Sequence, residues 1–229
     1  MKFSVIVPAL NEEKSILACL SALQPYRGFC EIIVVDGGSQ DNTKHIAKPL
    51  ADKVISSERG RACQMNAGAE EAEGEMLVFL HADTYLPDNA FGEIEQALTS
   101  NRQWGRFDIL LTGRHPMLKI IARLMNWRSR LTGIATGDQV IFAAKALFVA
   151  AGRYPCIALM EDIAICKTLK KYSAPICLNS KVISSGRRWE KFGVFKTILL
   201  MWSLRLRFFF GADPQLLALL YSKGRFWKT

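Results

Sequence analysis

The first hundred residues alternate short apolar runs with longer segments in which apolar residues recur at helical spacing. The apolar runs are continuous rather than alternating, which is typical of strands buried on both faces. This pattern predicts strands at 3–7, 31–35, 53–55 and 76–80 and helices at 12–23, 43–51 and 61–73. Strand–helix–strand alternation implies right-handed crossovers, so we expect an α/β fold with a mostly parallel, Rossmann-like sheet flanked by helices on both sides.

The remaining residues follow a less regular pattern. We expect helices at 89–98, 117–131 and 161–171, and strands at 106–111, 139–143, 176–178 and 182–183. Residues 195–210 are mostly apolar and form the last expected helix. The pattern therefore predicts one α/β domain over residues 1–190, with a C-terminal helical segment, residues 191–229, packed on it.

Length and hydropathy limit the class of protein. The chain has 229 residues, of which 50% are hydrophobic and 22% charged, as in an ordinary globular protein. Its longest uncharged apolar candidates, 197–204 and 214–222, fall far short of the ~20 residues that span a bilayer. The first apolar stretch is broken by Pro8 and ends at polar residues, unlike a signal peptide. We therefore expect a cytoplasmic protein rather than a secreted or multi-span one.

The six cysteines show no C-x-x-C pair. Without paired spacing they are not expected to bind zinc, and a chain of this size needs no disulfides. We expect small buried thiols in a reducing compartment.

Charge is concentrated at the C-terminus. Residues 1–180 carry 20 basic and 19 acidic side chains, whereas residues 181–229 carry 10 and 2, so eight of the nine excess positive charges lie in the last segment. Basic residues interleaved with bulky aromatics are typical of an amphipathic helix in the headgroup layer of an anionic membrane. A helix that closes the core or forms a dimer interface is the equally weighted alternative. No nucleic-acid-binding motif accompanies the charge, so no nucleic-acid partner is expected.

Polar residues follow three of the predicted strands. They are Pro8-Ala9-Leu10-Asn11-Glu12, Asp36-Gly37-Gly38-Ser39 and His81-Ala82-Asp83-Thr84. Each stretch alone is explained equally well by a turn with a helix N-cap. In an open α/β sheet, however, ligands bind beyond the carboxyl ends of the strands, and three such endings on one edge predict a nucleotide site.

These motifs resemble those of glycosyltransferase family 2, whose members have the GT-A fold. The similarity continues in order along nearly the whole chain, through Arg59-Gly60-Arg61 with Asn66, Gly137-Asp138-Gln139, Met160-Glu161-Asp162, Arg187-Arg188-Trp189 and Gly211-Ala212-Asp213-Pro214. The His81-Ala82-Asp83 variant and the short C-terminal segment are most similar to the small single-domain subgroup called rSAM/selenodomain-associated transferase 2. The resemblance implies a nucleotide-binding half at 1–100 and an acceptor half at 101–190.

The resemblance also implies the residues that bind a nucleotide-sugar donor. A first group lies at the ends of the first two strands: Pro8, Ala9, Leu10, Asn11, Glu12, Asp36, Gly37 and Ser39. Asp36 would accept hydrogen bonds from the base or ribose. A second group comprises Arg59, Arg61, Asn66, Asp138, Arg188 and Trp189. Cationic side chains beside a helix N-terminus suit a diphosphate, whereas a solvent-facing Arg61 is the alternative.

In the family a metal ion is held by an Asp-x-Asp motif, and here His81 replaces the first aspartate. Asp83 matches the second and is the expected ligand of Mg²⁺ or Mn²⁺, with phosphate oxygens completing the shell. His81 is a candidate second ligand if the ion is Mn²⁺, since imidazole is a poor ligand for Mg²⁺. A hydrogen-bonded structural histidine is the alternative.

By the same resemblance Asp162 is the catalytic base, and Glu161 orients the acceptor; a plain acidic first helical turn is the alternative. We expect an inverting transfer of one sugar, with UDP as the nucleotide, to a hydroxyl acceptor such as a lipid or lipid-linked molecule. The Gln-x-x-Arg-Trp motif of polymer-forming relatives is incomplete, because Ser185 replaces its glutamine. A nucleotidyltransferase and an inactive membrane-peripheral scaffold at the cytoplasmic face are the alternatives.

Overall fold

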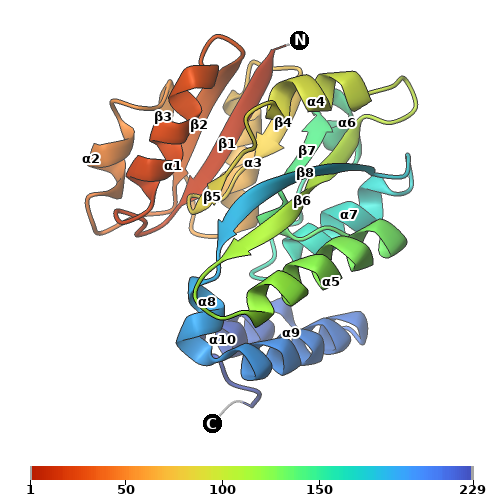
Figure 1. The fold of residues 1–229 in the computed structure, drawn as a ribbon. Coiled ribbons are helices and arrows are strands. Elements are labelled where there is room, and N and C mark those ends of the chain that lie inside the picture. The colour runs from red at the N-terminus through yellow and green to blue at the C-terminus, as the bar shows by residue number, and fades with distance from the viewer. Residues whose placement is uncertain (1, 228–229) are drawn as a thin grey trace.

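The computed structural model describes residues 2–227, and its core is a curled eight-stranded sheet (Figure 1). The strand order is β3-β2-β1-β4-β7-β6-β8-β5. The amino-terminal half contributes four parallel strands: β1 (Phe3–Ala9), β2 (Cys30–Asp36), β3 (Lys53–Ser56) and β4 (Met76–Phe79). All residues of β1, β2 and β4 are buried, as their continuous apolar runs predict.

The second half of the sheet is mixed. Its strands are β5 (Thr84–Tyr85), β6 (Trp104–Thr112), β7 (Ile141–Ala144) and β8 (Ile176–Ser185). β7 runs antiparallel to both β4 and β6, β5 runs antiparallel to β8, and β6 and β8 are parallel. The two short strands expected at 176–178 and 182–183 are one strand, because a register shift opposite Phe107 and Asp108 lets the ladder continue.

Helices cover both faces of the sheet, as expected. α1 (Ile16–Leu23), α2 (Thr43–Ala47), α4 (Ala90–Ala97) and α5 (Met117–Thr132) pack into one hydrophobic cluster. α3 (Arg61–Glu71), α6 (Lys145–Ala150) and α7 (Glu161–Leu169) pack into a second cluster on the other face. Short 3₁₀ turns, η1 (Gln24–Tyr26) and η2 (Gly137–Gln139), precede β2 and β7.

Three helices form the C-terminal segment: α8 (Arg187–Phe192), α9 (Val194–Phe209) and α10 (Pro214–Lys223). α10 begins at Pro214, and the Asp213 carboxylate caps it by accepting a hydrogen bond from the backbone N–H of Gln215. α9 and α10 share a third apolar cluster with Met160 and Ile163 at the start of α7. In Figure 1 this blue helical layer lies beside α5. Residues 228–229 of the expected segment lie outside the described range, and the domain division at residue 190 stays a prediction.

No helix between residues 2 and 227 combines the length and apolar character needed to cross a bilayer.

The cysteines only partly follow expectation. Cys19, Cys30 and Cys166 are buried, and burial raises the pKa of each thiol to about 12. The expectation of burial is wrong for Cys156, which is exposed, with its Sγ 3.2 Å from the Sγ of Cys63 on α3.

Gly68 permits the close approach of α3 to the sheet. A Cβ at this position would lie 2.5 Å from Cγ2 of Ile6 and 3.0 Å from Cγ2 of Val35. Because Ile and Val are branched at Cβ, neither can turn its methyl group away cheaply. We predict that Gly68→Ala lowers the free energy of unfolding by about 1–3 kcal/mol, although alanine is the better helix former.

Urea denaturation measures this change. Gly28→Ala is the matched control, because nothing lies within 4 Å of a Cβ there, and we expect its effect to stay within about 0.5 kcal/mol. A Gly68→Ala protein as stable as the native one would show that α3 can move away from β1 and β2 without cost.

Candidate active site

The loops after β1 and β2 are tied together at the edge of the sheet. Asp36, the last residue of β2, is buried and accepts hydrogen bonds from the backbone N–H groups of Gly38 (3.1 Å) and Ser39 (3.1 and 3.2 Å). The hydroxyl of Ser39 accepts from the backbone N–H of Asn11 at 2.9 Å, and Oδ1 of Asn11 accepts from that of Gln40 at 2.8 Å. Pro8, Ala9 and Leu10 lead into this junction, so the first expected group of donor-binding residues lies together at one edge.

Gln64 on α3 supports the same edge, and sequence reasoning missed it. Its buried Nε2 donates to the carbonyl oxygens of Ala9 and Val35, both at 2.8 Å, and so joins the ends of β1 and β2. Gly37 makes room for it, because a Cβ there would lie 3.0 Å from Cδ of Gln64. A signal was present: Gln64 precedes Gly68 by one helical turn and therefore occupies a core-facing position.

Arg187, at the start of α8, links two of the expected site carboxylates. Its Nη2 lies 2.8 and 3.0 Å from the carboxylate oxygens of Glu12 and 3.2 Å from Oδ2 of Asp83. The sequence predicted donor binding by Arg188, the next residue, whereas the arginine that contacts these carboxylates is Arg187. Glu12 and Asp83 are thus brought together by a residue more than a hundred positions away.

Asp83 is largely desolvated and lies among both basic and acidic side chains. Burial raises the pKa of its carboxyl; His81 and Arg187 oppose this rise, and Asp138 and Glu12 add to it. The hard carboxylate oxygens of Asp83, with Glu12 nearby, fit a divalent cation that brings phosphate oxygens with it. Within residues 2–227 no group of three or more His, Cys, Asp or Glu side chains could enclose an ion, so oxygens of a ligand are needed to complete such a site.

His81 is buried and contacts Asp138, in η2. Its Nδ1 lies 3.1 Å from Oδ1 of Asp138. Desolvation opposes the charge of Asp138, but the hydrogen bond to His81 and the charges of His81, Arg61 and Arg188 together outweigh it and lower the pKa of Asp138. The ring fits closely against Gly137, where a Cβ would lie 2.6 Å from Nε2 of His81. Metal ligation by His81 stays a prediction, while its contact with Asp138 agrees with the structural alternative.

Glu161 and Asp162 begin α7, directly after Met160, whose backbone is left-handed (φ 72°). The carboxylate of Asp162 is held at both oxygens: Oδ2 accepts from the N–H of Gly137 at 3.1 Å, and Oδ1 from that of Ile163 at 2.7 Å. Glu161 is buried, and this burial, together with the charge of Asp162, raises the pKa of Glu161. The two adjacent carboxyl groups therefore have different environments.

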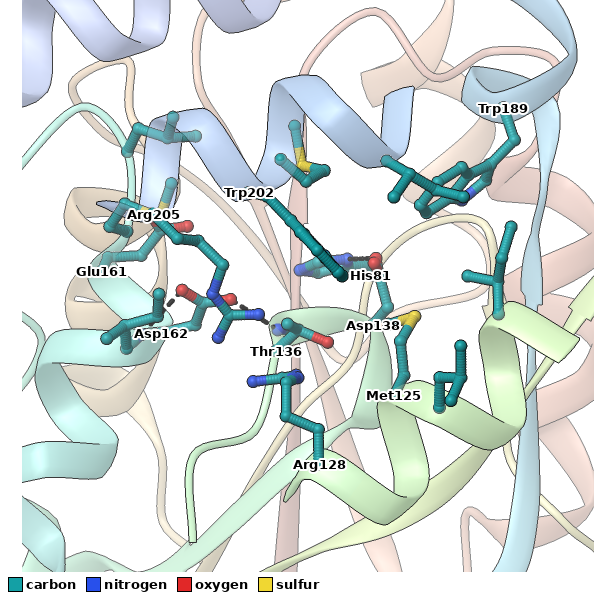
Figure 2. Close-up of a pocket in the computed structure, with 18 of the residues that line it drawn as sticks. His81, Met125, Arg128, Thr136, Asp138, Glu161, Asp162, Trp189, Trp202 and Arg205 are labelled. Atoms are coloured by element: carbon teal, nitrogen blue, oxygen red, sulfur yellow. Dashed lines mark hydrogen bonds and ion pairs between the residues drawn. The ribbon is translucent and has the colours of Figure 1, made fainter. Parts of the chain in front are cut away.

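These groups face one cavity of about 420 Å³ (Figure 2). His81, Asp138, Glu161 and Asp162 line its polar end, and Arg61 lies among them at the start of α3. Apolar side chains from α5, α7 and α9 line much of the rest, and Arg128 of α5 and Arg205 of α9 also face the cavity. The expected base and the histidine two positions before Asp83 therefore share a cavity, although Asp83 itself is not part of its lining.

The remaining predicted residues have different surroundings. Arg59 is exposed. Desolvation opposes the charge of Arg61, which also lies at the surface, but the nearby Tyr221 oxygen and the carboxylates of Glu161 and Asp138 outweigh it and raise the pKa of Arg61. The amide of Asn66 is bonded to the backbone of Tyr154, donating to its carbonyl at 2.8 Å and accepting from its N–H at 3.1 Å. Asn66 thus fixes the segment before α7.

Arg188 and Trp189 lie on α8 with different contacts. The guanidinium of Arg188 stacks over the ring of Tyr221 on α10, 3.3 Å from its centroid, and donates to the carbonyl of the same residue. Trp189 lines the cavity. Arg188 therefore joins α8 to α10, while Trp189 faces the space where a ligand would bind.

Comparison with known proteins gives the sequence relationship. A model of the family Glycosyl transferase family 2 matches residues 4–131. Glycosyltransferase AglE of Haloferax volcanii is 37% identical over 90 residues, which are 35% of this chain and 30% of that relative. The matched part of the chain therefore spans under a third of that protein's length.

Solved structures give the fold relationship. The mannosyltransferase PcManGT of Pyrobaculum calidifontis, in complex with GDP-Man and Mn²⁺, has a TM-score of 0.66 and 21% identity, covering 90% of this chain and 61% of that one. A fragment of TarS of S. aureus, residues 1–349, in complex with UDP, has a TM-score of 0.63 and 21% identity, covering 89% and 66%. The fold is therefore of the GT-A type, as expected, and because the family model covers more than half of the sequence, this chain belongs to glycosyl transferase family 2.

Proposed function

We propose that this chain transfers a single sugar from a nucleotide-diphospho-sugar, with UDP as the nucleotide, to a hydroxyl acceptor and inverts the anomeric centre. One observation carries the proposal: Asp162, Glu161, Asp138 and Arg61 come from three separate segments and face one cavity. UDP and GDP-Man in the solved neighbours support a nucleotide donor.

The donor occupies the edge formed by β1, β2 and α3 in this proposal. Asp36 receives the base or ribose, with Gly37, Ser39 and the Pro8–Glu12 stretch as the surrounding wall. Arg61 and Arg59, at the start of α3, face the diphosphate, because cations next to a helix N-terminus stabilise phosphate oxygens. Asn66 and Arg188 act as positioning residues, since their polar groups already hold neighbouring segments.

Asp162 is the proposed base. The acceptor oxygen attacks the anomeric carbon while its proton passes to Asp162, and the bond from that carbon to the diphosphate oxygen breaks, so the nucleoside diphosphate leaves with the electron pair. A single displacement inverts the centre. The backbone N–H groups of Gly137 and Ile163 donate to Asp162 and fix the direction of its carboxylate. Glu161, whose pKa is raised by burial and by Asp162, orients the acceptor.

A divalent ion, Mg²⁺ or Mn²⁺, is part of the proposal. Asp83 would hold it together with the donor's phosphates, and it would supply positive charge to the departing diphosphate. Arg187 holds Asp83 and Glu12 in place beside it.

The acceptor is proposed to be a lipid or lipid-linked molecule, with the protein bound at the cytoplasmic face of a membrane. Two exposed apolar stripes support this. One lies on α5 (Ile120, Leu124, Trp127, Leu131) and the other on α9 (Phe195, Leu199, Trp202, Leu206, Phe209). Both helices also wall the cavity. Exposed apolar surface of this extent marks an interaction site, and a cavity that opens between the two stripes would receive its acceptor directly from the lipid layer.

We predict that Asp162→Asn lowers the rate of sugar transfer by about 10²–10⁴-fold, the usual contribution of a positioned base, while UDP affinity stays unchanged. Transfer from labelled nucleotide sugars to extracted lipids measures this. Glu71→Gln is the control, because Glu71 is exposed at the far end of α3. Near-native turnover by Asp162→Asn would remove Asp162 from the mechanism.

We predict that Asp83→Asn abolishes the extra stabilisation that Mn²⁺ adds to UDP binding, as measured by thermal shift. A ligand at a hundred times its Kd stabilises a protein by about 2.7 kcal/mol, so the loss is readily seen. Because burial raises the pKa of Asp83, its charge opposes folding near neutral pH, and the free variant should be no less stable than native protein. Asp88→Asn, an exposed neighbour, is the control. Equal Mn²⁺-dependent stabilisation of both variants would refute the role of Asp83.

We predict that the double variant Phe195→Glu, Phe209→Glu binds vesicles of phosphatidylglycerol and phosphatidylcholine at least tenfold more weakly than native protein in a sedimentation assay. Both rings are about 70% exposed on α9, and burial of each apolar side chain contributes about 1.5–3 kcal/mol. Phe29→Glu, exposed at a distant loop, is the control. Unchanged vesicle binding would show that this stripe does not meet the membrane.

A further inference from the structure

Two arginines face each other inside the cavity. Arg128 comes from α5 and Arg205 from α9, and Figure 2 shows their guanidinium groups pointing toward one another beside Asp162. The basic C-terminal pattern places Arg205 with the residues expected at a headgroup layer. In the structure it instead lines the cavity, next to the proposed base.

Neither arginine is neutralised by the protein. Arg128 donates from Nη1 to the carbonyl of Ile134 at 3.3 Å, while its buried Nη2 has no hydrogen-bond partner. No hydrogen bond or ion pair within residues 2–227 involves Arg205. Asp162 acts on both through its charge, but its two oxygens already accept backbone N–H groups. Two cations therefore share one carboxylate that forms an ion pair with neither.

This arrangement is unfavourable without a ligand. Burial lowers the pKa of Arg128 to about 10, with Arg205 as the next cause, and burial also lowers the pKa of Arg205. Both side chains are half-buried, and a partly desolvated cation without an ionic partner costs free energy that an anion restores. The surrounding wall, which includes Ile121, Met125 and Met201, is apolar. The cavity thus suits a molecule with an anionic group and an apolar chain.

We propose that Arg128 and Arg205 form the anion subsite of the acceptor, and that the acceptor is an amphiphile with a phosphate group next to the hydroxyl that receives the sugar. The hydroxyl lies at Asp162, the phosphate lies between the two guanidinium groups, and the apolar chain follows the walls of α5 and α9 toward the exposed stripes. Arginine forks bind phosphate oxygens in pairs, which also fixes the direction of the hydroxyl. This inference rests on the proposed function.

Three soluble probes separate the parts of this ligand: a short-chain lysophosphatidic acid, the matching monoacylglycerol without phosphate, and glycerol 3-phosphate without a chain. Binding is followed by the fluorescence of Trp127, Trp189 and Trp202, which line the cavity. We expect the native protein to bind lysophosphatidic acid at least tenfold more tightly than either of the other probes. Equal affinity for the two lipids would overturn the proposal, and tightest binding of glycerol 3-phosphate would show that the arginines serve a free phosphate.

The variants Arg128→Met and Arg205→Met test the subsite. Each should weaken lysophosphatidic acid binding about tenfold or more, leave monoacylglycerol binding unchanged, and melt near or above the native temperature, because a half-buried charge without an ion pair is removed. Arg123→Met, exposed on α5, is the matched control and should bind like the native protein. Unchanged affinity for lysophosphatidic acid in both cavity variants would overturn the proposal.

UDP binding with Mn²⁺ separates this inference from the proposed function. Native and variant proteins should bind UDP alike. Loss of UDP affinity in Arg128→Met or Arg205→Met would assign these arginines to the donor diphosphate and overturn the acceptor subsite. If the native protein binds neither UDP nor another nucleotide, the proposed function fails, while the comparison of the three lipid probes still decides whether the anion subsite exists.

Discussion

Parallel pairing of β1 with β2 and β4 is the constraint on which the rest of the molecule depends. The register places Ala9 beside Asp36, and Ile6 beside Phe79, so the chain leaves all three strands at one edge. The loops there must satisfy their own backbone groups, and they do so with site residues: Asp36 caps its own turn, and Gln64 spans two strand ends. The polar groups of the site are thus also the groups that complete the sheet.

Much of this edge could be predicted from the sequence, because it is local. Apolar runs define β1, β2 and β4, and the polar residues after them mark the loops. Boundaries are less predictable than the elements: the first helix begins at Ile16 rather than near residue 12, and the N–H of Glu12 donates to the hydroxyl of Thr43. The antiparallel direction of β7 was not predicted, because one strand's sequence does not specify the direction of its neighbour.

The sequence predicts which residues lie near the site, but it does not predict which way each side chain points. Asp83 and Asp162 follow from motif and position, whereas the choice between Arg187 and Arg188 depends on how α8 packs against the sheet and α10. Asn66 was expected at a diphosphate, yet its amide holds Tyr154 across 88 residues of sequence. The residues around Arg205 have the composition of a surface helix. Only the packing of α9 in the folded chain places Arg205 in the cavity lining. Charge counts locate a basic segment but cannot say which of its cations are buried.

Gly137 limits which substitutions this part of the site can accept. Any side chain there would push into the imidazole of His81, and its N–H also holds Asp162. A larger residue at this position would therefore have to displace the ring of His81. The apolar side chains of α5 and α9 in the cavity wall, such as Ile121 and Met201, are where a change of specificity can be explored while the partners of Asp162 stay in place.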